Sequence, residues 1–220
     1  MKRNRSNVKP RKVNYDSLHK QYKDPTNLQF KKLKKVSSYI LGGYALLDIG
    51  IGTGELIQQE RERFDVIYGI DSDEDSVEIC RQMFLHDSNV NILLDDITNL
   101  TKIPSAMKFD FITALDVFEH IPLCKMSEGL SAIYAHLKED GTFIFTGPGI
   151  FEKLLILLGR SPTHLHSHSS YGWKKIIEKS GFIVDYIAAI EFPLYDHIFL
   201  REKFHLFGKC CLIIARKMKS

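Results

Sequence analysis

The sequence has little of what a disulfide-stapled, zinc-binding or membrane-spanning protein needs. Its 220 residues hold only four cysteines, Cys80, Cys124, Cys210 and Cys211. Their spacing fits neither a disulfide framework nor a structural zinc site. No apolar run approaches the roughly 20 residues of a membrane-spanning helix, and the N-terminus is basic and polar where a signal peptide would be apolar. These absences predict a soluble, cytoplasmic protein.

Charge is nearly balanced overall but unevenly distributed. Residues 1–35 hold 12 Lys or Arg against Asp16 and Asp24, a net +10, so the remainder of this +3 chain carries −7. Such a segment can attract RNA, anionic lipid or a phosphorylated substrate, but its composition favours a solvated extension over residues 1–13. We therefore expect a basic, partly disordered arm over residues 1–25. A single domain over residues 26–220 should follow, because a chain of this size buries one full core.

Beyond the arm, apolar runs alternate with amphipathic stretches, which predicts an α/β fold with helices on both faces of a parallel sheet. The expected strands cover residues 44–49, 66–70, 90–94, 109–115, 142–146, 183–190 and 210–215. The expected helices cover residues 26–39, 54–63, 74–86, 125–137 and 171–180.

The most informative segment is LLDIGIGTGE, in which a buried strand runs into three glycines and then into a helical pattern. Gly50, Gly52 and Gly54 permit unusual backbone conformations and let a ligand lie against the main chain near a helix start. The dinucleotide fingerprint needs a glycine where Glu55 stands, and a pyrophosphate would meet that carboxylate. An adenosyl ligand with ammonium and sulfonium charges would instead be attracted by acids such as Asp48. A glycine-rich turn without a ligand is the alternative.

Two further acids follow the next two strands. Asp71 ends the second strand in YGID, 17 positions after the last glycine of the loop, close to the roughly 20-residue offset at which an acid takes ribose hydroxyls. Capping of the following helix is its alternative role, although Ser72 or Asp73 can perform that task. In LLDDI, Asp96 can accept a hydrogen bond from an adenine amino group while Ile97 packs on the ring. A surface turn acid is the alternative for Asp96.

These segments, together with FDFITALDVFEHI over residues 109–121, resemble the class I S-adenosylmethionine-dependent methyltransferases, and among them the ubiquinone-biosynthesis-like small-molecule group. The resemblance covers about residues 33–215. It implies a Rossmann-like, mostly parallel sheet of seven strands in the order 3-2-1-4-5-7-6, with strand 7 antiparallel. It also implies S-adenosylmethionine as cofactor and S-adenosylhomocysteine as product. A second, shorter match, LLILLGR followed by THLH, implies that an insert over residues 149–168 covers the acceptor side, where the loop 192–207 forms another wall.

The resemblance also implies which residues act. Cofactor contacts are expected at Asp48, Gly50, Gly52, Gly54, Asp71, Ser72, Asp96, Ile97, Leu115 and Asp116. The cofactor supplies the reactivity of an in-line methyl displacement, so the protein contributes alignment, and a general base where the acceptor must lose a proton. The expected catalytic residues are His120, which titrates near neutrality, and His164 in the insert. Orienting the cofactor tail is the alternative role for Glu119 and His120.

The alternating histidines His164, His166 and His168 would share one face of an extended segment and so imitate a metal site. No cysteine or carboxylate lies within this run to complete a ligand set, and the resembled family usually works without a metal. We therefore predict no metal site. Ser169 or Ser170 is expected to cap the helix that follows.

The leading functional prediction is methyl transfer from S-adenosylmethionine to oxygen in a small-molecule, lipid or glycan acceptor. One alternative is an RNA methyltransferase that uses the basic arm to bind phosphates with strong salt dependence. Against it, the fourth strand ends in LDVF and lacks the Asn-Pro-Pro-Tyr type of motif found in base-amino methyltransferases. Another alternative is a cofactor-binding partner protein without turnover. A nicotinamide dehydrogenase is disfavoured because Glu55 interrupts its fingerprint.

Overall fold

The computed structural model describes residues 15–24, 27–150, 156–159, 163–190 and 210–218. The expected extension over residues 1–13 and the loop 192–207 lie outside these ranges, as does part of the insert 149–168. Helix α1 (Tyr15–Lys23) lies within the segment predicted as the arm. In the described part of the chain, no helix has the length and apolar character to cross a membrane.

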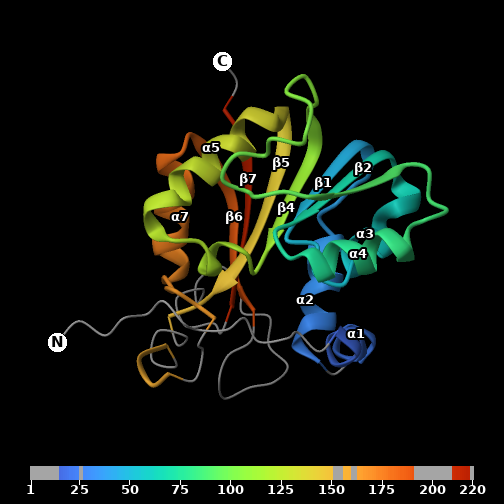
Figure 1. Ribbon diagram of the computed structural model, residues 1–220. Helices are drawn as coiled ribbons and strands as arrows, with labels where there is room; N and C mark the ends of the chain where they lie inside the picture. The colour runs from blue at the N-terminus through green and yellow to red at the C-terminus, as the bar shows by residue number, and fades with distance from the viewer. Residues whose placement is uncertain (1–14, 25–26, 151–155, 160–162, 191–209, 219–220) are drawn as a thin grey trace.

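A seven-stranded sheet forms the centre of the molecule (Figure 1). Its strands are β1 (Gly43–Ile49), β2 (Phe64–Asp71), β3 (Val90–Leu94), β4 (Phe109–Leu115), β5 (Leu137–Pro148), β6 (Phe182–Ile190) and β7 (Cys210–Lys217). They lie in the order β3-β2-β1-β4-β5-β7-β6. The pairs from β3 to β5 are parallel, whereas β7 runs antiparallel to both β5 and β6. The expected strand order and the antiparallel seventh strand are confirmed.

One face of the sheet is covered by α5 (Met126–His136) and α7 (Ser170–Lys179). Their buried side chains, including Leu130, Ile133 and Trp173, join the core cluster that contains alternate residues of the strands. Burying such apolar side chains contributes about 1.5 to 3 kcal/mol each. Both helices therefore pack against the sheet through an extensive apolar layer.

The other face is covered by α2 (Leu28–Ser37), α3 (Glu55–Glu60) and α4 (Glu74–Met83), whose buried residues form a second core cluster. The short 3-10 helices η1 (Arg61–Arg63), η2 (Phe118–His120) and η3 (Leu123–Lys125) connect elements around the sheet. Helices on both faces are thus confirmed, and the five expected helices are observed with ends shifted by up to three residues.

Side-chain N-caps stabilise the first turns of α4 and α7. The Asp73 carboxylate accepts from the Ser76 amide (3.0 Å) at the start of α4, and the Ser169 hydroxyl accepts from the Gly172 amide (3.1 Å) at the start of α7. Both satisfy backbone donors that a helix leaves unpaired. The expected cap at Ser169 is confirmed, and Asp73 rather than Asp71 caps α4.

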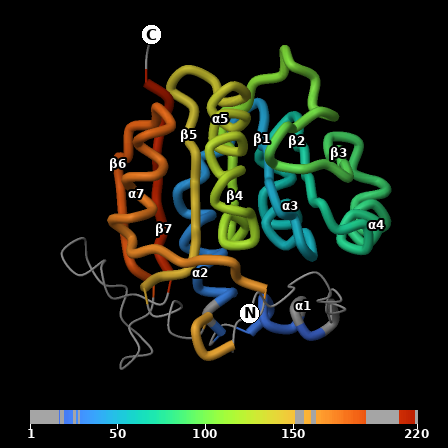
Figure 2. Tube along the Cα trace, turned by 60° about the vertical axis from the view of Figure 1, so that its left-hand side comes forward, coloured from blue at the N-terminus to red at the C-terminus, as the bar shows by residue number. Residues whose placement is uncertain are grey.

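The carboxyl ends of the parallel strands meet at one edge of the sheet, which is where open α/β sheets bind ligands. Figure 2 shows helix α1 and the segment leading into α7 at this same edge, although they are far apart in the sequence. The glycine loop after β1, Asp71 at the end of β2 and the residues after β4 also converge there.

Candidate functional site

The glycine loop leaves β1 with its backbone in the left-handed region. Gly50, Gly52 and Gly54 have φ of 72°, 52° and 80°, values that side-chain-bearing residues adopt only with strain. The Gly50 amide donates to the Ile70 carbonyl (2.8 Å), which fixes the loop against β2. A Cβ on Gly50 would lie 2.4 Å from Val117 Cγ2, whereas a Cβ on Gly52 would meet no atom within 4 Å. The main chain at Gly52 therefore faces open space in which a ligand can approach it.

Asp71 braces this loop from the end of β2. Its Oδ2 accepts from the Gly52 amide (3.1 Å) and its Oδ1 accepts from the Asp73 amide (2.9 Å). Burial raises the pKa of Asp71, although these backbone donors oppose the change. The carboxylate is thus held in a fixed orientation at the edge of the open space.

Asp48, on β1, is a buried carboxylate directly beneath the loop, with a relative exposure of 3%. The Thr113 hydroxyl donates to its Oδ1 (2.6 Å). Burial raises the pKa of Asp48 to about 7; the Thr113 hydrogen bond opposes this, while the negative charges of Asp71 and Glu55 add to it. A carboxylate in this environment becomes fully ionised only at the expense of free energy, so a bound cation would stabilise it.

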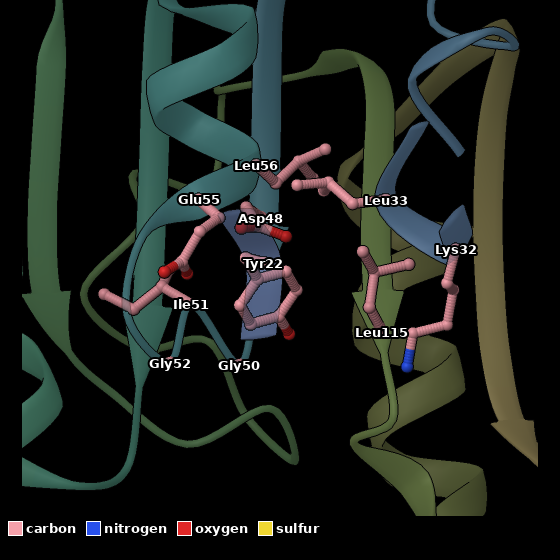
Figure 3. Close-up of a pocket in the computed structure, with 10 residues that line it drawn as sticks. All are labelled: Tyr22, Lys32, Leu33, Asp48, Gly50, Ile51, Gly52, Glu55, Leu56 and Leu115. Atoms are coloured by element: carbon pink, nitrogen blue, oxygen red, sulfur yellow. The ribbon is translucent and has the colours of Figure 1, made fainter. Parts of the chain in front are cut away.

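A pocket opens at this position (Figure 3). Its walls come from α1, α2, β1, the glycine loop, α3 and β4: Tyr22, Lys32, Leu33, Asp48, Gly50, Ile51, Gly52, Glu55, Leu56 and Leu115. Four of the expected cofactor residues, Asp48, Gly50, Gly52 and Leu115, are therefore brought together in its lining.

Tyr22 and Lys32 line the pocket but were not anticipated from the sequence. Burial raises the pKa of Tyr22 to about 12. Lys32 is 3% exposed, and its ammonium forms an ion pair with Asp116 just after β4. Burial alone would lower the pKa of Lys32, but the attraction of Asp116 outweighs it and raises the value. The spacing of Lys32 could have indicated its burial, because it lies four residues before the apolar Val36 and therefore on the same face of α2.

Asp116 is held at the pocket by several groups. It has a φ of 57°, and the Thr146 hydroxyl donates to its Oδ1 (2.9 Å). Burial would raise the pKa of Asp116, but Lys32 and these hydrogen bonds lower it overall. The carboxylate is therefore ionised at neutral pH and pairs with Lys32 of α2.

The remaining expected cofactor residues lie apart from the pocket lining. Ser72 and Asp96 are exposed, and Ile97 is packed in the core at 7% exposure. The Asp96 carboxylate accepts from the Thr98 amide (2.8 Å), which lowers its pKa. Gly54 begins α3 as its N-cap residue. Ser72 directly follows β2, and Asp96 and Ile97 follow β3, whereas Gly54 lies between β1 and α3.

On the other side of β4, the insert lies along the segment that starts with η2. The Leu165 amide donates to the Glu119 carbonyl (2.8 Å), and the His166 ring (Nε2) donates to the Ile121 carbonyl (2.9 Å). The rings of His120 and His164 pack with centroids 5.1 Å apart at 68°. The two expected catalytic histidines are thus neighbours.

His166 and His168 belong to a different cluster. Their rings pack against Trp173 with centroids 5.7 Å and 4.7 Å away, respectively. The three alternating histidines therefore do not act as one face, because His164 turns toward His120 while the other two cover α7. Loss of hydration lowers the pKa of His120; the Thr163 carbonyl opposes this, and the His164 ring adds to it.

Comparison with known proteins identifies a family for this chain. A family model described as "Methyltransferase domain" matches residues 17–187, most of the chain. The match begins within α1, the first helix of the structure, and ends within β6. It therefore includes the glycine loop, the pocket and the described part of the insert.

Individual relatives are more distant. A ubiquinone biosynthesis O-methyltransferase of Coxiella burnetii (strain Dugway 5J108-111) is 31% identical over 93 residues, 41% of this chain, and the chain spans only 39% of that relative's length. One from Idiomarina loihiensis is 27% identical over 190 residues, covering 77% of this chain and 76% of the relative. The crystal structure of a SAM-dependent methyltransferase from Archaeoglobus fulgidus shares the fold, with a TM-score of 0.70, 23% identity and coverage of 93% and 100% of the two chains.

Proposed function

This chain belongs to the methyltransferase domain family, and we propose that it transfers the methyl group of S-adenosylmethionine to a hydroxyl oxygen of a small-molecule acceptor. The family match and the sheet order agree with the assignment to the class I S-adenosylmethionine-dependent methyltransferases. The observation that carries the proposal is the open glycine loop, which has the fixed carboxylate of Asp71 on one side and the buried carboxylate of Asp48 beneath it.

The groups around the pocket match the chemistry of this cofactor. S-adenosylmethionine carries an ammonium, a sulfonium, a carboxylate and two ribose hydroxyls, and it carries no phosphate. We assign the ribose hydroxyls to Asp71, the ammonium to Asp48 and the carboxylate to Lys32, because opposite charges and charge-assisted hydrogen bonds are the strongest contacts available there. The cofactor supplies an activated methyl group when bound. The chain supplies binding and orientation.

The other expected contacts complete this assignment. Gly50, Gly52 and Gly54 would keep the main chain accessible to the methionine part, and Leu115 would pack beside it. We assign the adenine end to Asp96 and Ile97, with Ser72 at the ribose, since these residues follow β2 and β3 at the same edge of the sheet. Asp116 would act through Lys32, which it orients by the ion pair.

We place the acceptor on the side of His120 and His164. Two relatives are named ubiquinone biosynthesis O-methyltransferases, which supports a small molecule and an oxygen target. Methylation of a hydroxyl releases a proton, so a group that lowers the acceptor's pKa or removes the proton is needed. His120, which follows the pocket residue Leu115 in the chain, and His164, which packs against its ring, can provide such a group.

The test is a transfer assay with purified protein and methyl-labelled S-adenosylmethionine, using small-molecule, lipid, glycan and RNA fractions as separate acceptors. We expect label in the small-molecule fraction. Label in RNA, or in none of the fractions despite intact binding of S-adenosylhomocysteine, would contradict the proposed acceptor. The purified acceptor then allows the site to be tested residue by residue.

In that second assay, His120→Ala and His164→Ala should lower turnover while the affinity for S-adenosylhomocysteine stays nearly unchanged, because both act on the acceptor. His86→Ala is the matched control, since His86 is an exposed histidine in the connection from α4 to the start of β3, at the edge of the sheet opposite the carboxyl ends of the strands. Full turnover in both site variants would remove these histidines from the reaction.

A further inference from the structure

Residues 163–166 form a clasp against the short helix η2. The Leu165 amide donates to the Glu119 carbonyl (2.8 Å). Two residues earlier in the chain, the Thr163 carbonyl oxygen lies 3.0 Å from Nδ1 of His120. The clasp therefore contacts His120, the expected base, through a backbone group that comes from more than 40 residues further along the chain.

The contact with Thr163 fixes the tautomer of His120. A carbonyl oxygen can only accept, so Nδ1 of His120 carries the proton and the lone pair of the neutral ring is on Nε2. The hydrogen bond that one ring nitrogen makes determines whether the other is available as a base. Burial lowers the pKa of His120, and the Thr163 carbonyl opposes this. The same bond therefore stabilises the imidazolium that forms when Nε2 takes up a proton.

His166 joins the clasp to the residue that follows η2. Its Nε2 donates to the Ile121 carbonyl (2.9 Å), and its ring packs on Trp173 with the ring centroids 5.7 Å apart. Trp173 is 1% exposed, and its indole N–H donates to the Pro148 carbonyl at the end of β5 (2.9 Å). The clasp is thus held between η2 and an aromatic ring that is itself fixed to the sheet.

Packing alone does not account for a histidine at position 166. The second ring nitrogen of His166, Nδ1, is buried and has no hydrogen-bond partner among the described residues. Burying a polar atom without a partner costs free energy. A leucine or a phenylalanine could pack on Trp173 without that cost. The hydrogen bond from Nε2 to Ile121 is the contact that only a polar side chain can make here.

We propose that the clasp positions the base of the methyl transfer: the Thr163 carbonyl holds His120 in the tautomer with an available Nε2, and His166 keeps Thr163 in place. His166 is then a positioning residue, which acts on the reaction through His120. This inference rests on the proposed oxygen methylation.

The clasp gives the proton of the acceptor a defined destination. The acceptor hydroxyl gives its proton to Nε2 of His120, and its oxygen bonds to the methyl carbon as the carbon–sulfur bond breaks with its electrons remaining on sulfur. The imidazolium then returns the proton to solvent from Nε2. Without the Thr163 contact, the neutral ring can carry its proton on Nε2, where it no longer accepts one.

Histidine-selective ¹⁵N labelling of the whole chain tests the tautomer without any acceptor. The ring-nitrogen chemical shifts of a neutral histidine distinguish a protonated Nδ1 from a protonated Nε2, and the His120 signals are those missing from His120→Ala. At about pH 8, where histidine is neutral, we expect His120 to be protonated on Nδ1. His166→Ala should move it toward the Nε2-protonated form. His166→Gln, whose amide N–H can replace the donor, should restore the wild-type tautomer.

Turnover of the acceptor found in the labelling assay measures the consequence for catalysis. His166→Ala should lower kcat at least about tenfold, since a positioned base contributes about 10²–10⁴-fold, with the affinity for S-adenosylhomocysteine nearly unchanged. His166→Gln should recover most of this loss. His168→Ala is the matched control, because His168 packs on the same indole, with ring centroids 4.7 Å apart, but lies outside the clasp. It should keep the wild-type tautomer and turnover.

Several results would overturn the inference. They are an Nε2-protonated His120 in the wild type, an unchanged tautomer in His166→Ala, an equal loss of turnover in His168→Ala, and no recovery in His166→Gln. Affinity for S-adenosylhomocysteine shows that each variant is folded. Because the tautomer is measured without an acceptor, failure of this inference differs from failure of the proposed methyl transfer, which would leave the tautomer intact and give no labelled product.

Discussion

The ion pair between Lys32 and Asp116 joins helix α2 to the segment that follows β4. It predicts that substitutions of its two partners have unequal effects on stability. Lys32→Met removes the ammonium but keeps a chain of similar length. Asp116→Asn removes the negative charge but keeps the size and tolerates a positive φ, because asparagine adopts the left-handed region more easily than most residues. Each variant thus deletes one charge with little other change.

The magnitudes follow from the unequal burial of the two side chains, which are 4% exposed for Lys32 and 31% for Asp116. In Asp116→Asn, a buried ammonium loses its carboxylate, which should cost about 3 to 5 kcal/mol of unfolding free energy. In Lys32→Met, Asp116 keeps the Thr146 hydroxyl and contact with water, and the cost of burying the ammonium disappears. That variant should lie within about 1 kcal/mol of the wild type.

Urea unfolding at pH 7 without cofactor measures both variants and the double variant. At this pH both groups are charged, since the pKa of Asp116 is lowered and that of Lys32 is raised. Because folding lowers the pKa of Asp116, ionised Asp116 stabilises the folded state above about pH 4. This stabilisation is lost only as the pH falls through the pKa of the folded state. We expect the double variant to resemble Lys32→Met. Equal losses in the two single variants, or a larger loss in Lys32→Met, would refute the burial argument.

Three further outcomes concern the cofactor. Asp71→Ala should weaken S-adenosylhomocysteine binding by about 1 to 3 kcal/mol in calorimetry, through loss of a charge-assisted pair; unchanged affinity would contradict the ribose assignment. The pKa of Asp48 is raised to about 7, so the ionised form that attracts the ammonium is lost as the pH falls. The affinity for S-adenosylhomocysteine should therefore drop about tenfold from pH 8 to pH 6. Asp48→Asn should abolish this pH dependence. Deleting residues 1–13 should leave affinity unchanged, since α1 and its Tyr22 remain; lost binding by a folded protein would contradict this.

The sheet and the glycine loop were predictable because their signals are local. A strand running into glycines is encoded within ten residues, and the left-handed φ of Gly50, Gly52 and Gly54 explains why no other residue type stands there. The strand order came from the resemblance rather than from periodicity, because pairing between distant strands has no local signature.

The pocket residues Tyr22 and Lys32 were not predicted, because their burial depends on contacts with distant parts of the chain. Tyr22 fell in the predicted basic arm over residues 1–25, and Lys32 fell in the expected helix over residues 26–39, where a lysine is normally exposed. A sequence pattern shows total charge but not which lysine meets a carboxylate. Lys32 is buried only because Asp116, 84 positions away, compensates it. Tyr22 is similarly defined by its position over the glycine loop.

The cluster of Glu119, His120 and His164 was also not predictable from the sequence, because its members come from distant segments. The sequence analysis named His164 as a candidate catalytic residue, but it sought metal-binding partners for His164 only within the run of residues 164–168, where no cysteine or carboxylate occurs. Its ring instead packs on His120 and its segment hydrogen-bonds to the backbone of Glu119. A cluster built from distant segments needs convergence in space, and here that convergence depends on the backbone hydrogen bond between Leu165 and Glu119. The sequence contains each of these groups, but only the fold determines that one carboxylate and two imidazoles lie close together.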